Sequence, residues 1–191
     1  MGMYLVSVDA REWCRAGEGG WGEVATALRE ELRCRGLPPW SAVPARSGDW
    51  VPFEEKMSPP MEGFDRLCRA HLTPEEAEVL GGWTVLVPPA LPGLVHLPVA
   101  SAFAEETTVA GAPQVLGLAE RLAQVVELPE ETPRRCVNLD LTRWFMDGPA
   151  RQLAGARPGA WSDDLDTAFY VALYLRAAQH ALRQRCPLVY S

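Results

Sequence analysis

The sequence predicts an α+β fold in which helices pack on a small mixed or antiparallel sheet, with residues 1–191 forming a single domain. Three observations predict it. Short apolar runs rich in β-forming residues occur at both ends and in the middle of the chain. Amphipathic helical patterns separate them, and a long C-terminal helix is apolar on nearly every side. The length fits one domain.

The first half of the chain begins with a buried strand at residues 3–8. An amphipathic helix follows at 21–36, with its apolar residues on one face. Residues 37–60 are rich in proline and have no apolar period, so they predict a long loop. Helical spacing returns at 64–71, and a capping box that starts at Thr73 predicts another short helix.

The second half begins with two predicted strands, at residues 83–87 and 94–97, joined by a proline turn. A helix then starts at Pro113 and ends before Pro129. Residues 136–148 fit a short helix slightly better than a strand. Residues 188–190 predict a final strand.

The last helix is predicted to begin at Ser162 as its N-cap and to stop before Pro187. Its middle, residues 168–175, is apolar nearly all round, so it is expected to be the central core helix. Charged residues at its two ends complement the helix dipole: Asp163, Asp164 and Asp166 at the start, and Arg176, His180, Arg183 and Arg185 at the end.

The amino-acid composition indicates the kind of genome that encodes the protein and the partners that it is expected to lack. The chain has no isoleucine, one lysine (Lys56) and one asparagine (Asn138), which indicates a GC-rich bacterial genome such as that of an actinobacterium. The net charge is −7 and no run of basic residues exceeds two, so we expect no nucleic-acid partner.

Five widely spaced cysteines, an odd number, indicate reduced thiols. The N-terminus lacks the features of a signal peptide. Residues 79–104 carry no charge and are long enough to cross a bilayer, but four prolines interrupt them. We therefore predict a cytoplasmic protein without a membrane span.

Few motifs point to catalysis or cofactors. The chain has no phosphate-binding loop, no dinucleotide glycine pattern and no G-x-S-x-G motif, and no cofactor is expected. Cys68 and His71 have the spacing of half a zinc site, but no second close pair exists, so we expect both to line the core face of their helix. The acidic residues 163–166 are better explained by helix capping than by a cation site. No metal is predicted.

A cationic stripe is expected at the end of the last helix, where Arg176, His180 and Arg183 recur at i, i+4 and i+7. A solvent-exposed face matched to the helix dipole explains it. The alternative is a site for an anion or a carboxylate-bearing partner.

The long loop supplies the main binding candidates. Seven tryptophans are many for this length, and aromatic residues in loops often form ligand pockets and interfaces. The candidates are Trp40, Asp49, Trp50, Phe53, Glu54 and Glu55. Aromatic faces beside carboxylates suit a cationic or amphipathic partner. The alternative is that Trp50 and Phe53 pin the loop onto the core.

His96 is a further candidate, although a histidine inside an apolar run is more often a core residue. If the protein is an enzyme with a dispersed site, its titrating groups would be His71 or His96 with a carboxylate such as Glu54, Glu55 or Asp9.

Met1-Gly2-Met3 leads directly into a strand, and a long C-terminal helix carries Phe169-Tyr170 and Ala177-Ala178 before the tail at residues 187–190. In these features both ends of the chain resemble the YfbM-like family of uncharacterised bacterial proteins. The resemblance implies a small cytosolic α+β protein and assigns no functional residues.

The function predicted from these features is a non-catalytic binding or protein-interaction domain, with a protein partner or a small ligand. The alternative is a small-molecule enzyme with a dispersed histidine and carboxylate site.

Overall fold

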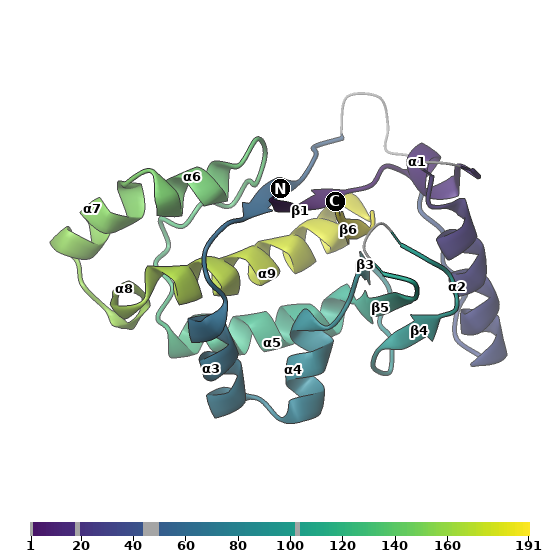
Figure 1. Cartoon of the computed structure of the whole chain (residues 1–191), viewed down its shortest axis with the longest axis horizontal. Coiled ribbons are helices and arrows are strands. Elements are labelled where there is room, and N and C mark those ends of the chain that lie inside the picture. Colours follow the sequence, from purple (N-terminus) through teal and green to yellow (C-terminus); the bar gives the residue numbers. More distant parts are fainter. Residues whose placement is uncertain (1, 18–19, 44–49, 102–103) are drawn as a thin grey trace.

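The computed structural model describes residues 2–17, 20–43, 50–101 and 104–191 and has the predicted α+β fold (Figure 1). In these residues, no helix has both the length and the apolar character needed to cross a membrane. All five cysteines are free thiols.

One six-stranded mixed sheet has the order β2-β1-β6-β3-β5-β4. Among the described strands, β3 and β5 pair in parallel and the other neighbouring pairs are antiparallel. The strands are β1 (Met3–Ser7), β2 (Glu54–Met57), β3 (Val85–Val87), β4 (Val95–Leu97), β5 (Thr107–Gly111) and β6 (Leu188–Tyr190).

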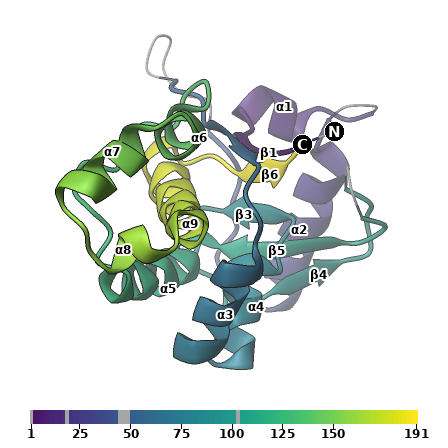
Figure 2. The ribbon, with the colours of Figure 1, turned by 60° about the vertical axis from the view of Figure 1, so that its left-hand side comes forward.

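The helices cover both faces of this sheet. They are α1 (Ala10–Cys14), α2 (Gly22–Cys34), α3 (Glu62–His71), α4 (Pro74–Gly81), α5 (Ala112–Val125), α6 (Asp140–Met146), α7 (Pro149–Ala156), α8 (Ala160–Asp163) and α9 (Leu165–Gln184). Figure 2 shows α5 and α9 on one side of the sheet and α1 and α2 on the other.

Two hydrophobic cores result from the alternation of strand side chains. Leu86 of β3 and Leu188 of β6 belong to the larger core, beneath α5 and α9. Val85 and Val189, their neighbours along the strands, belong to the smaller core against α1 and α2. The central strands are therefore apolar on both faces, as expected for strands covered on both sides.

Helix α9 is the centre of the larger core, as predicted. Every residue from Thr167 to Ala178 is buried, and α3, α5, α6 and α8 pack around it. Its N-cap is Asp164, whose carboxylate accepts hydrogen bonds from the backbone N–H and the hydroxyl of Thr167. The prediction of Ser162 as the cap is wrong, because Ser162 belongs to α8 and closes that short helix against Gly159.

Two strands, β2 and β5, were not predicted. Residues 54–57 lie within the predicted loop 37–60, yet they form β2, an edge strand paired with β1. Its sequence, EEKM, is polar, and its place in the sheet depends on backbone pairing with β1 together with hydrogen bonds between Glu55 and α6. The predicted strands β3 and β4 exist but do not pair with each other, because β5 lies between them.

Other predictions are confirmed or refined. Residues 136–148 do contain a short helix, α6, which ends at Met146. Thr73 forms the predicted capping box with Glu76 at the start of α4. The final strand, β6, lies in the middle of the sheet between β1 and β3, so the tail of the chain completes the sheet.

Replacing Leu173 of α9 by alanine tests the central position of this helix. Leu173 is fully buried, so the variant should lose about 2–5 kcal/mol of unfolding free energy in urea denaturation, through lost burial and a residual cavity. Val125→Ala, at a position on α5 that is 39% exposed, is the control and should change stability by no more than about 0.5 kcal/mol. Equal, small effects of both variants would contradict a buried α9.

Candidate functional site

The predicted loop residues do not come together in one site. Trp40 is half-buried and packs on Trp13, with ring centroids 5.8 Å apart. Trp50 is half-buried, whereas Phe53 is buried and meets the ring of His180 edge-on at 5.3 Å. Asp49 lies outside the described residues. Phe53 therefore pins this segment onto the core, as the alternative interpretation predicted for it.

The two adjacent glutamates of β2 have different roles. Glu54 is exposed, but Glu55 is fully buried. The Glu55 carboxylate accepts hydrogen bonds from the backbone N–H groups of Leu141 and Thr142, both at 2.8 Å, and from the Thr142 hydroxyl at 2.7 Å. Burial raises the pKa of Glu55, and these donors offset part of that rise. Glu55 thus anchors the start of α6 to the sheet.

The histidine candidates also lie apart from one another. His96 is exposed on the edge strand β4, where its Nδ1 lies 3.4 Å from the Thr108 hydroxyl; the expectation of a core position is wrong. His71 is exposed at the end of α3, so it does not share the core face with the buried Cys68. In the described chain, neither histidine lies within 4.0 Å of a carboxylate, and no group of three metal-ligating residues occurs.

The cationic stripe on α9 lies differently from the solvent-exposed face we expected. Arg176 and His180 are 8% and 5% exposed, and only Arg183 reaches solvent. The solvent-face interpretation is therefore wrong for the first two residues. Arg176 lies against the backbone of residues 132 and 133, and His180 lies against the ring of Phe53, so neither side chain faces open solvent.

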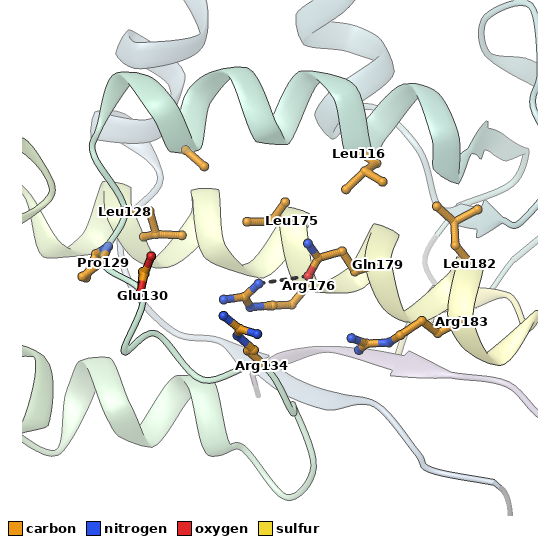
Figure 3. Close-up of a pocket in the computed structure, with 11 residues that line it drawn as sticks. Leu116, Leu128, Pro129, Glu130, Arg134, Leu175, Arg176, Gln179, Leu182 and Arg183 are labelled. Atoms are coloured by element: carbon orange, nitrogen blue, oxygen red, sulfur yellow. Dashed lines mark hydrogen bonds between the residues drawn. The ribbon is translucent and has the colours of Figure 1, made fainter.

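Arg176 forms one wall of a groove of about 620 Å³ between α5, α9 and the segment that follows α5 (Figure 3). Apolar side chains form one row along it: Leu116, Leu128, Leu175 and Leu182. Arginines form the other row: Arg134, Arg176 and Arg183. We call this site the α5–α9 groove.

The segment after α5 is held by its own backbone. The chain turns at Glu127, which has a φ of 52°, and Leu128 donates back to the carbonyl of Ala123. This turn carries residues 129–134 alongside α9, where the carbonyls of Thr132 and Pro133 meet the Arg176 side chain.

The Arg176 guanidinium is held only by neutral groups. Its Nε donates to the Pro133 carbonyl at 2.8 Å, one Nη to the Thr132 carbonyl at 3.1 Å and the other to Gln179 Oε1 at 2.9 Å. Burial lowers the pKa of Arg176, the nearby Cys136 offsets part of this effect, and the neighbouring Arg134 and Arg183 lower the pKa further. The charge is therefore buried in an electropositive environment.

No counter-ion balances these charges in the part of the chain that the structure describes. Arg134, Arg176 and Arg183 have no carboxylate within 4.0 Å, and this includes Glu130, which also lines the groove. Figure 3 shows the Arg134 and Arg176 side chains beside each other below Leu175. A protein with a net charge of −7 thus gathers three unpaired arginines along one apolar groove.

Part of this site could be found from the sequence. The spacing of Arg176, His180 and Arg183 marked the stripe, and an anion site was its alternative explanation. The partners could not be found: Arg134 comes from a segment without regular structure, and Leu116 lies outside the apolar stripe that predicted the helix α5.

Comparison with known proteins returned no matching family model, no matching curated protein and no matching solved structure. The resemblance of the chain ends to the YfbM-like family stays a prediction. The geometry and charge of the α5–α9 groove are therefore the observations that bear on function.

Glu55→Gln tests the anchoring of α6. The glutamine NH₂ replaces one acceptor oxygen by a donor that faces the donors of α6, so unfolding free energy should fall by about 1–3 kcal/mol in urea denaturation. Glu54→Gln is the matched control at the exposed neighbour and should stay within about 0.5 kcal/mol of the wild type. If the two variants were equally stable, Glu55 would not hold α6.

His180 should make the protein sensitive to acid. Burial, with Arg183 nearby, lowers its pKa from 6.5 to about 4, and its Nε2 has no hydrogen-bond partner among the described residues. The pKa of His180 is lower in the folded protein than in the unfolded chain. The unfolding free energy therefore has its full value above pH 6.5 and decreases as the pH falls to about 4. The shift in the pKa of His180 from 6.5 to about 4 corresponds to a loss of about 3 kcal/mol in unfolding free energy.

Urea denaturation at pH 7 and pH 4 measures this loss. The wild type should lose about 3 kcal/mol more than His180→Leu between the two pH values. His71→Leu, at an exposed histidine, should behave like the wild type. An equal loss in the wild type and His180→Leu would show that His180 does not titrate on unfolding.

Proposed function

We propose that the protein is a non-catalytic binding protein whose α5–α9 groove takes a small anionic amphiphile, an alkyl chain with a carboxylate or phosphate head group. The observation that supports this proposal is Arg176: a buried cation with no carboxylate partner in the described chain, placed at the wall of an apolar groove.

Arg176 has hydrogen-bonding capacity left for a ligand. A guanidinium carries five N–H donors, and the neutral oxygens around Arg176 take three of them. The remaining two lie on the terminal nitrogens, beside the Arg134 side chain (Figure 3). Carboxylate and phosphate oxygens are the groups that such paired donors bind most strongly.

The unpaired charge also creates a driving force. Burying a cation without a partner is costly, and two neighbouring arginines raise that cost because like charges repel. An anion bound between Arg134 and Arg176 would offset both the cost of burying the Arg176 charge and the repulsion between the arginines. The same anion would complete an ion pair that the chain itself does not supply.

The leucine row accounts for the apolar part of the ligand. Leu116 and Leu182 border the groove on α5 and α9, on the side opposite the arginine row, so a ligand along α9 meets apolar groups on one side and cationic groups on the other (Figure 3). A volume of about 620 Å³ lies in the ordinary range for small-molecule sites. This size favours a small ligand over a protein partner.

The absence of a catalytic constellation in the described chain supports a binding role. No histidine lies within 4.0 Å of a carboxylate there, and Glu55 is fully engaged with α6. An acid–base enzyme needs such groups within reach of one substrate.

Isothermal titration calorimetry with dodecyl phosphate and dodecanoate, below their micelle concentrations, tests the proposal. Both should bind with one-to-one stoichiometry, and 1-dodecanol and dodecyltrimethylammonium should bind at least tenfold more weakly. Arg134→Gln should lower the affinity for dodecyl phosphate about 10- to 100-fold, which is the value of one charge-assisted hydrogen bond. Because the Arg134 side chain is exposed, we expect this variant to fold as the wild type does.

Arg69→Gln is the matched control, because Arg69 is exposed on α3 and does not line the groove. It should bind dodecyl phosphate as the wild type does. Equal affinities for 1-dodecanol and dodecyl phosphate, or an unchanged affinity in Arg134→Gln, would refute an anion site at this groove.

A further inference from the structure

A second pocket lies at one end of the sheet and shares no lining residue with the α5–α9 groove. The register explains its position. Met3 of β1 pairs with Met57 of β2, and Tyr190 of β6 lies opposite Leu5, so the first residue of β1 and the last residues of β2 and β6 meet at the same end. The pocket holds about 330 Å³.

Three aromatic rings form a rigid part of its wall. Trp83 stacks on Tyr190 with ring centroids 5.0 Å apart and an interplanar angle of 16°, and Tyr174 meets Trp83 edge-on at 6.0 Å. The Trp83 indole N–H donates to the Leu80 carbonyl at 2.9 Å, which fixes the ring in place. Trp83 and Tyr174 are each only 1% exposed, so packing in the core fixes the positions of their rings.

Three methionines, Met3, Met57 and Met61, form a more adaptable part of the wall. Methionine side chains are flexible and polarisable, and their sulfur atoms contact aromatic rings favourably. A wall of this kind, together with fixed aromatic rings, suits a planar aromatic ligand better than a branched aliphatic one.

Several polar groups at this pocket are hydroxyls. The Tyr174 and Tyr190 hydroxyl oxygens lie 3.3 Å apart, and the Ser101 Oγ is buried with no hydrogen-bond partner among the described residues. A buried hydroxyl without a partner is unfavourable, and a ligand group that bonds to it removes that cost. The described lining residues carry no charge, so the pocket provides nothing to balance a charged ligand.

We propose that this pocket is a second binding site, for a neutral, planar bicyclic aromatic molecule that carries one hydrogen-bonding group. The volume of the pocket favours a ligand with two fused rings. An apolar cavity of about 150 Å³ holds benzene, and this pocket has about twice that volume. The hydrogen-bonding group meets the Ser101 hydroxyl. The proposal does not rest on the α5–α9 groove, because the two sites share no lining residue among those described.

Indole is the probe, and calorimetry with the full chain is the measurement. Indole should bind with a dissociation constant below about 1 mM, and the charged analogue indole-3-carboxylate should bind at least tenfold more weakly. Ser101→Ala should weaken indole about fivefold to tenfold, the value of one neutral hydrogen bond. Met61→Trp fills the pocket from a half-buried position and should abolish indole binding.

The two sites serve as controls for each other. Leu116→Trp obstructs the α5–α9 groove and should leave indole affinity unchanged, whereas Met61→Trp should leave dodecyl phosphate affinity unchanged. Thermal unfolding of each variant verifies that it folds. No indole binding to the wild type up to 1 mM, equal binding to Met61→Trp, or equal binding of indole-3-carboxylate would overturn the proposal without affecting the one for the groove.

Discussion

The burial of residues 167–178 of α9 is the constraint on which the rest of the structure depends. The helix lies between α5 and α6, touches α3 and α8, and leads directly into β6 in the middle of the sheet. Alanines at positions such as 168, 172, 177 and 178 are fully buried and let the neighbouring elements approach closely. A helix in this position has no solvent-facing side along its middle, so its polar residues have to be accommodated inside. Arg176 and His180 are those residues.

The protein accommodates Arg176 with backbone rather than with an acid. Segment 129–134 brings two carbonyls to the guanidinium, which satisfies hydrogen bonds but leaves the charge uncompensated. The same segment continues to Cys136, whose carbonyl accepts a 2.8 Å hydrogen bond from the Glu54 backbone N–H. Glu55 then fixes the start of α6. The polar strand β2, the segment after α5 and the wall of the groove are thus one connected unit.

How much the sequence predicts depends on how local the determining forces are. The long helices α2 and α5 follow from apolar periodicity, α9 follows from its apolar middle and its charged ends, and all three are present within a few residues of where they were predicted. Strand β2 could not be predicted, because its EEKM sequence carries no alternation and its place depends on pairing with β1, about fifty residues away. The same is true of Glu55: whether a glutamate faces solvent or caps a helix depends on contacts 86 and 87 residues distant.

The candidate site shows the same division. The i, i+4, i+7 spacing marked Arg176, His180 and Arg183, but burial decides their chemistry, and burial depends on which elements surround α9. His96 illustrates the opposite error: apolar neighbours suggested a core position, but β4 is an edge strand and its middle side chain faces solvent. Pattern alone identifies a face of an element, and the packing of the fold determines whether that face is covered.

A crystal structure of the protein with dodecyl phosphate is the most direct test of the central claim, that the buried charge of Arg176 is completed by a bound anion. The account predicts phosphate oxygens within hydrogen-bond distance of both Arg134 and Arg176, with the alkyl chain along Leu116, Leu175 and Leu182. A head group bound elsewhere on the protein, or a groove occupied by the alkyl chain alone with the phosphate in solvent, would contradict it.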